Sequence, residues 1–236
     1  MKLRVQLLVL ATLVFTVGAF AQLVPSNTGV VQSPFQVRYF ANLNIGDSYI
    51  DMTNDGSTLT TRGSFTTGNI CVNVYAFDPA EELVSCCTCL ITPNALVSLS
   101  VRQDLTSNTL TPATPTSITA KLMAVTPSIN SSTGANTCNA ATLPSTTIGN
   151  GSGTGTPNLS GSLHAWGTTL HANTSTTPTS YNATETEFSS AQLLFGNSTD
   201  YEAYRITSYC GFIQAVGSGF GICKSCRTGG LGAARQ

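Results

Sequence analysis

Residues 69–77 read Asn-Ile-Cys-Val-Asn-Val-Tyr-Ala-Phe, and this stretch decides the fold class. Successive side chains of a β-strand point to opposite faces, so alternation with a period of two is typical of a strand. One face of this stretch carries Ile70, Val72, Val74 and Ala76, and the other carries Cys71, Asn73, Tyr75 and Phe77. The stretch is therefore predicted to be a strand.

Similar strand patterns recur along the chain, at residues 36–40, 82–90, 97–101, 118–124 and 163–171. Asn54-Asp55-Gly56 separates residues 49–53 from residues 57–62, and Asp-Gly is a strong signal for a tight hairpin turn. About eight strands at such spacings are typical of an antiparallel β-sandwich. We therefore expect a mainly β fold of this kind.

A single convincing helix is expected near the C-terminus. Thr199 and Glu202 form a capping-box pattern, which marks a helix start. An apolar stripe at helical spacing follows, and Gly211 and Gly217 are expected to limit the helix length. The stripe consists of Ala203, Ile206, Cys210 and Ile213.

The N-terminus has the features of a secretory signal peptide. Lys2 and Arg4 precede an apolar run over residues 7–15, and Ala19-Phe20-Ala21 fits the small-x-small cleavage pattern. The apolar stretch over residues 5–21 is at the lower limit for spanning a bilayer, so cleavage is favoured over a membrane anchor. Because no later stretch approaches spanning length, we expect a secreted, extracellular or cell-surface product, or a periplasmic one in a bacterium.

Composition divides the remaining chain. Residues 126–161 are mostly Ser, Thr, Asn, Gly and Pro, which predicts a long exposed loop attached only at Cys138. We expect a signal peptide at residues 1–21, a main β-sandwich region at residues 22–125 and this loop at residues 126–161. A segment with the last strand, the helix and the Cys-rich stretch follows at residues 162–226, and a basic Gly-rich tail at residues 227–236.

The chain is poor in charge. Only 9% of its 236 residues are charged, the formal net charge is −1, and 36 Thr with 25 Ser make up about a quarter of the residues. Binding to nucleic acid depends on a basic surplus that neutralises phosphates, so this class of partner is not expected. A low charge also argues against a coiled coil or a charged helical bundle.

The eight cysteines predict a disulfide framework, because thiols outside the cytosol oxidise and remain oxidised. Neighbours in a strand point to opposite faces and rarely bond to each other, so the two Cys clusters are expected to bond to one another. This hypothesis staples the C-terminal segment to the strand around residues 86–89 and leaves a fourth pair between Cys71 and Cys138. The first cluster is Cys86, Cys87 and Cys89, and the second is Cys210, Cys223 and Cys226.

Two other interpretations of the cysteines remain open. Cys87, Cys89, Cys223 and Cys226 could form a four-thiolate zinc site, although the first pair lacks the usual two-residue spacing. Cys223 and Cys226 alone have the spacing of a redox dithiol, but the following Arg-Thr-Gly-Gly does not favour the helix that lowers a thiol pKa. No cofactor is expected.

Catalytic groups are few. His164 and His171 lie seven residues apart in an extended segment, on opposite faces and about 23 Å apart, so they cannot act together. Asp47, Asp51 and Asp55 are spaced about 13 Å from one another along a strand, which is too far for a pair of glycosidase carboxyls. We interpret them as a solvated edge and a turn, and they are only weak candidates for a metal site.

Aromatic side chains and sequons are the remaining binding signals. Trp166 and Tyr181 are weak candidates for contacts with a carbohydrate or another small ligand. Six Asn-x-Ser/Thr sequons, which bear glycans only in a eukaryotic host, occur at Asn130, Asn150, Asn158, Asn173, Asn182 and Asn197.

Three classes of function fit the sequence. The first is an extracellular structural or surface protein that acts by assembly with itself or by adhesion to other surface components, for example a filament subunit that uses residues 22–40 as an exchanged strand. The second is a secreted module that binds glycans or small ligands. The third, a secreted hydrolase or a thiol redox protein, is least favoured because so few ionisable groups are present. We therefore do not expect an enzyme.

Overall fold

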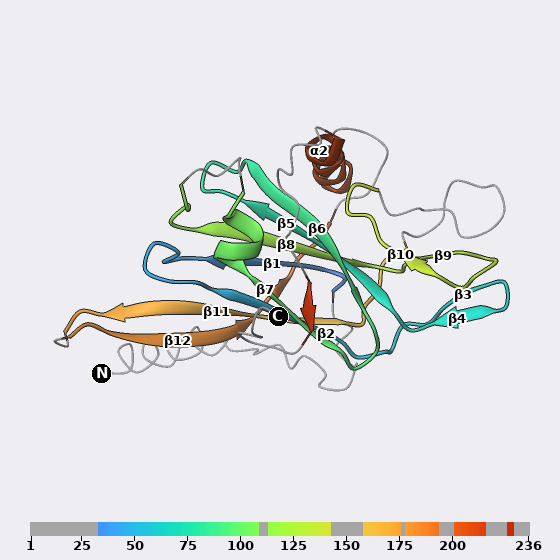
Figure 1. Cartoon of the computed structure of the whole chain (residues 1–236), viewed down its shortest axis with the longest axis horizontal. Coiled ribbons are helices and arrows are strands. Elements are labelled where there is room, and N and C mark those ends of the chain that lie inside the picture. The colour runs from blue at the N-terminus through green and yellow to red at the C-terminus, as the bar shows by residue number, and fades with distance from the viewer. Residues whose placement is uncertain are drawn as a thin grey trace, which may run out of the picture. The chain divides into compact units, whose positions relative to one another are not determined.

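The computed structural model describes residues 33–108, 113–142, 158–175, 178–193, 201–215 and 226–228. These residues form a mainly β structure with antiparallel sheets and one C-terminal helix, α2 (Glu202–Ala215) (Figure 1). The predictions of a mainly β, antiparallel fold and of the C-terminal helix are confirmed. The predicted signal peptide, residues 1–21, lies outside the described residues.

The first large sheet has five strands in the order β13-β1-β8-β5-β6, all paired antiparallel. The strand predicted from residues 69–77 is β5, and it lies between β8 and β6. The bounds are β13 Ser189–Ser190, β1 Phe35–Phe40, β8 Ile118–Val125, β5 Ile70–Phe77 and β6 Leu83–Ile91.

The second large sheet has the order β12-β11-β2-β7-β14 and is also antiparallel. Residues 169–173 of β11 pair with β12 alone, so the β11–β12 hairpin extends beyond β2, as Figure 1 shows. The bounds are β12 Ser180–Glu187, β11 Leu163–Asn173, β2 Tyr49–Asn54, β7 Leu96–Ser100 and β14 Arg227–Thr228.

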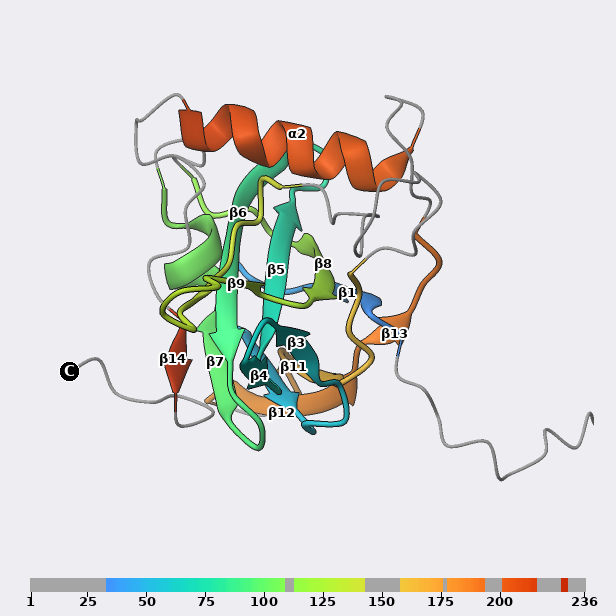
Figure 2. The same cartoon turned by 90° about the vertical axis from the view of Figure 1, so that its right-hand side faces the viewer.

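One hydrophobic cluster contains residues from both sheets. Val72 and Val74 of β5 belong to it together with Ile50 of β2 and Leu163 of β11, and all four are fully buried. A second cluster covers the other face of the first sheet, where Ile206 and Cys210 of α2 pack near Tyr75. Figure 2 shows α2 lying across β5 and β6. The first sheet is therefore covered on both faces, which explains why β5 is buried along almost its whole length.

The predicted hairpin at residues 54–56 is wrong. β2 pairs with β11 and β7, while β3 (Thr60–Arg62) forms its own small hairpin with β4 (Phe65–Thr67). Asn54 explains the difference: its Nδ2 donates to the carbonyls of Gly68 and Ile91, and its Oδ1 accepts from the N–H of Gly56. These bonds turn the chain at Gly56, with φ at 74°, without pairing the strands on either side.

The stretch 126–161 also differs from the exposed loop that was expected. Within its described part, β9 (Ser128–Ile129) pairs with β10 (Asn136–Thr137). Ala140 is fully buried, and its carbonyl accepts a hydrogen bond of 2.8 Å from the Tyr75 hydroxyl. Residues 126–142 are therefore attached by packing as well as by Cys138.

Gly211 does not limit the helix, because it lies within it, while Gly217 lies outside the described residues. The four residues of the predicted apolar stripe are all buried, which confirms the stripe. Glu202 at the first turn forms an ion pair with Lys121 of β8 at 2.5 Å. Thr199, the other half of the expected capping box, lies outside the described residues.

Candidate functional site

The candidate site lies on the outer face of the second sheet. Leu163 and Ala165 of β11 point into the shared core, so the alternate residues His164 and Trp166 face outward. Their rings stack with centroids 6.3 Å apart and planes within 15° of each other. His164 Nε2 also lies 3.0 Å from Asp55 Oδ2. The structure therefore brings together His164, Trp166 and Asp55.

Asp55 is the anionic partner in this group. Partial burial alone would raise the pKa of its carboxyl, but hydrogen bonds from the Ser57 N–H and from His164 outweigh burial and lower that pKa below its usual value. The carboxylate is therefore favoured at neutral pH. The predicted role of Asp55 as a turn residue is compatible with this geometry.

Asp51 has a different environment. It lies opposite Trp166 on one side and Ser98 on the other, and it is only 4% exposed. Burial raises the pKa of its carboxyl; a hydrogen bond from the Ser98 hydroxyl lowers it, and the charge of Glu185 raises it. Its second oxygen, Oδ2, has no hydrogen-bond partner among the described residues. The interpretation of Asp51 as part of a solvated edge is therefore wrong.

Asp47 stabilises the start of a short π-helix, η1 (Val101–Thr106). Its Oδ1 accepts from the Arg102 N–H at 2.8 Å, and its Oδ2 accepts from the Ser100 hydroxyl. Ser100 in turn accepts from the Gln103 N–H at 2.9 Å as the N-cap of the helix. Asp47 thus has a structural contact of its own, separate from Asp51 and Asp55. In the part of the chain that the structure describes, no three His, Cys, Asp or Glu residues come together as a metal site.

The two aromatic ligand candidates do not form one site. Trp166 is opposite Glu187 near the base of the hairpin, whereas Tyr181 is opposite Ala172 in its extended part. Six residues of β11 separate the two positions, which corresponds to about 20 Å. The described residues around Trp166 form a shallow depression that encloses no space for a ligand. That depression is lined by Gln36, His164, Ala165, Trp166, Glu187 and Phe188.

The two histidines face opposite sides of β11, as predicted. His171 Nε2 lies 2.9 Å from the Thr184 hydroxyl, on the face opposite to His164. The two rings therefore take part in separate contacts.

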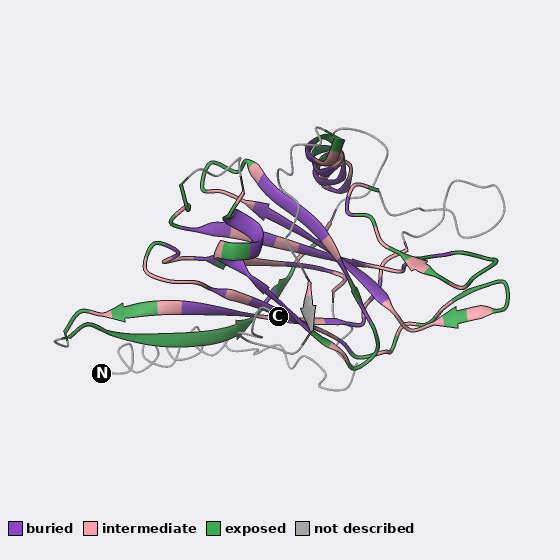
Figure 3. Cartoon of the chain, viewed as in Figure 1, coloured by how far each residue is buried: buried purple, intermediate pink, exposed green. Residues whose placement is uncertain are grey.

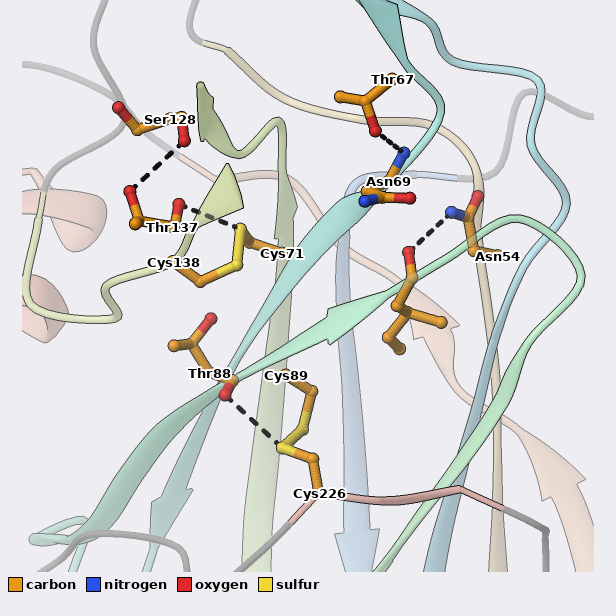
Figure 4. The surroundings of a disulfide bond; sticks show 11 residues. Asn54, Thr67, Asn69, Cys71, Thr88, Cys89, Ser128, Thr137, Cys138 and Cys226 are labelled. Atoms are coloured by element: carbon orange, nitrogen blue, oxygen red, sulfur yellow. Dashed lines mark hydrogen bonds between the residues drawn. A yellow bond between two sulfur atoms is a disulfide. The ribbon is translucent and has the colours of Figure 1, made fainter. Parts of the chain in front are cut away.

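The disulfides follow the predicted pattern. Cys71 bonds to Cys138 with Cα atoms 5.6 Å apart, and Cys86 bonds to Cys210 with Cα atoms 5.8 Å apart. Cys89 bonds to Cys226, also at 5.6 Å. Figure 4 shows the Cys71 bond near one end of β5 and the Cys89 bond on β6. The second and third bonds join the two Cys clusters, so the predicted staple of the C-terminal segment is confirmed.

Cys87 is also disulfide-bonded, while Cys223 lies outside the described residues. Because Cys226 is bonded to Cys89, it does not form a dithiol pair with Cys223. The same bond occupies two of the four thiols of the alternative zinc site. Both alternative interpretations of these cysteines therefore conflict with the Cys89–Cys226 bond.

Sequence reasoning missed two exposed surfaces. All eight residues of β12 are exposed, as Figure 3 shows, and this strand was not predicted. The outer face of α2 carries Tyr209 and Phe212, of which Phe212 is 72% exposed, and the exposed Tyr201 lies directly before the helix. The spacing of three residues between Tyr209 and Phe212 places them on one helix face and could have identified this surface.

Comparison with known proteins yields no assignment. No protein-family model, curated protein or solved structure matches this chain.

Proposed function

We propose that the protein is an exported, disulfide-bonded structural or surface protein that acts by assembly or adhesion. The observation that carries this proposal is the extended β11–β12 hairpin, whose outer strand is exposed at every residue. An exposed strand edge offers unpaired backbone groups to another chain. The disulfides support the proposed location, because such bonds persist in oxidising compartments.

The location proposed is secreted, extracellular or cell-surface, or periplasmic in a bacterium, after removal of residues 1–21. Among the described residues, no helix combines the length and the apolar character needed to cross a membrane. The proposal assigns no enzymatic activity, no cofactor and no nucleic-acid partner. The partners it names are other copies of the chain or other surface components.

The filament form of this proposal uses residues 22–40 as an exchanged strand. β1 already pairs with β8 at six consecutive positions of its own chain. The Pro34 carbonyl also accepts a hydrogen bond from the Ala124 N–H of β8, so an exchange that preserves this sheet takes only residues 22–32. Deletion of residues 22–32 is expected to abolish filament growth and leave the domain folded.

The test of the proposal is electron microscopy of the native protein with intact mass and sedimentation over a range of concentrations. Ordered assemblies, or sedimentation that increases with concentration, are expected. A chain that stays monomeric and adheres to no surface component would contradict the proposal. Intact mass reports cleavage before Gln22 and any glycans in the same experiment.

A second candidate function is glycan binding at Trp166. The observation that favours it is the outward-facing Trp166 ring, stacked on His164 beside Glu187. A glycan array with the wild type and the Trp166→Ala variant tests it, and Tyr181→Ala is the matched control about 20 Å away. Binding that is lost only in Trp166→Ala supports this function, and an array without hits contradicts it.

A further inference from the structure

We propose that the outer edge of β12 is an interface at which a second copy of this chain adds its own β12, antiparallel, about a twofold axis at Thr184. This inference rests on the proposed function and specifies the contact through which assembly begins. It commits to one occupant, a second copy of the chain.

The other edge strands of the two large sheets are less suited to pairing with a second chain. β13 and β14, the outermost strands of the two sheets at one end each, are only two residues long. β6, the remaining edge strand, packs against η1 and α2 and carries the disulfides to Cys210 and Cys226. β12 is eight residues long, and no described strand pairs with its outer side. It also lacks the Pro, Lys and bulges with which proteins protect such edges.

The ladder with β11 determines which backbone groups face the free edge. The Phe188 N–H donates to the Ala165 carbonyl at 2.9 Å, so the alternate residues before Phe188 also direct their backbone groups to β11. Those residues are Asn182, Thr184 and Thr186. The backbone N–H and C=O groups of Tyr181, Ala183 and Glu185 consequently point away from β11.

Charge selects the direction of pairing. β12 carries two carboxylates, Glu185 and Glu187, and no basic residue. Parallel pairing in register would place each carboxylate beside its own copy, and like charges across strands are unfavourable. Antiparallel pairing about Thr184 places Glu185 opposite Ala183 and Glu187 opposite Tyr181. This register pairs residues 181–187 of the two copies and closes as a symmetric dimer.

The first test compares Ala183→Pro with Ala183→Ser in the mature, disulfide-intact chain. Proline removes an N–H that faces the free edge and keeps the N–H groups of β12 that donate to β11, whereas serine retains the N–H at position 183. The dimer dissociation constant, measured by sedimentation, is expected to rise at least tenfold in Ala183→Pro and to stay within twofold in Ala183→Ser. Equal dissociation constants for both variants and the wild type would overturn the interface.

The second test is a cross-link that does not depend on proline. In the proposed register, Thr184 faces its own copy in a non-hydrogen-bonded pair with Cα atoms about 4.5 Å apart, within the range of a disulfide. Thr184→Cys is therefore expected to form a covalent dimer on oxidation. Thr186→Cys is the control, because its copy lies about 13 Å away along the strand. Equal cross-linking of the two variants, or none in Thr184→Cys, would overturn the register.

These outcomes separate the two proposals. If the wild type assembles, but Ala183→Pro does not weaken the assembly and Thr184→Cys forms no covalent dimer, the β12 interface is overturned and the proposed function is left intact. A wild type that remains monomeric and non-adhesive would overturn both. An N-glycan on Asn182 of the native protein would overturn the interface alone, because a glycan there obstructs a neighbouring strand.

Discussion

Arg38 connects the two large sheets through one side chain. It extends from β1 over the ring of Phe40 at 5.0 Å, and its guanidinium donates to the Thr186 carbonyl and the Thr169 hydroxyl, each at 3.1 Å. Gly167 makes room for it, because a Cβ there would overlap Arg38 Nε. Gly167 and Arg38 are therefore required together.

Replacement of Gly167 by alanine is expected to destabilise the protein by about 1–3 kcal/mol, since the new methyl group displaces Arg38 and Phe40. Urea denaturation measures the change. Gly211→Ala is the matched control: its Cβ would meet only Ala141 at 3.6 Å, and alanine in a helix is favoured by up to about 1 kcal/mol. A Gly167→Ala protein as stable as the wild type would contradict the packing around Arg38.

The raised pKa of Asp51 predicts how the stability of the protein depends on pH. Its pKa is raised on folding, so the folded state takes up a proton more readily than the unfolded state does. The contribution of Asp51 to stability is therefore most favourable below its unfolded pKa and decreases as pH rises through the folded pKa. Asp51→Asn removes this dependence, so its stability relative to the wild type is expected to increase from pH 3 to pH 7. Urea titrations at several pH values measure the difference, and a constant difference would contradict the raised pKa.

At the scale of elements, α2 is attached by packing, by one ion pair and by one disulfide. Ile206 packs near Tyr75, Lys121 contacts Glu202, and Cys210 is bonded to Cys86 of β6. The sequence separation between the two cysteines is 124 residues. A bond that closes so long a loop restricts the unfolded chain strongly.

The double variant Cys86→Ser/Cys210→Ser is expected to lose about 2–5 kcal/mol of stability. The control is Glu202→Gln, which removes a half-exposed ion pair and is expected to cost at most about 1 kcal/mol. Thermal unfolding followed by circular dichroism compares the two. Similar losses in both variants would indicate that the disulfide adds little to the attachment of α2.

Strands and helices could be predicted where alternation or an apolar stripe in the sequence reflects the burial of one face. β5 and α2 carry such patterns because each buries one face in a hydrophobic cluster. β12 escaped prediction because all its residues are exposed, so no burial pattern marks it. The hairpin predicted at residues 54–56 was wrong because Asp-Gly specifies only a local bend. The strands that pair with β2 depend on distant residues, those of β7 and β11.

At the scale of the whole molecule, the cross-links were more predictable than the candidate site. Side-chain alternation within a strand disfavours a bond between Cys86 and Cys87, and Cys86 indeed bonds to Cys210. The grouping of His164 with Asp55 was not predictable, because it depends on the pairing of β11 with β2. Burial of Asp51 likewise depends on tertiary structure rather than on its neighbours in sequence.

The cysteine framework makes one further prediction. Three pairs and a bonded Cys87 leave Cys223 as the only remaining partner in the chain. A non-reducing peptide map is therefore expected to contain a Cys87–Cys223 peptide, and the intact mass should be that of a chain without free thiols. A Cys223–Cys226 peptide in the map would contradict the staple.

The staple between β6 and the C-terminal segment has a consequence for the biogenesis of the protein. Cys86 leaves the ribosome 124 residues before Cys210, and Cys89 leaves it 137 residues before Cys226. At a synthesis rate of about 5–20 residues per second, the early thiols wait roughly 6–27 seconds for their partners. Throughout that interval, three closely spaced thiols are open to incorrect pairing with one another. Correct oxidation therefore depends on an environment that keeps them reduced, or reshuffles them, until the last residues of the chain arrive.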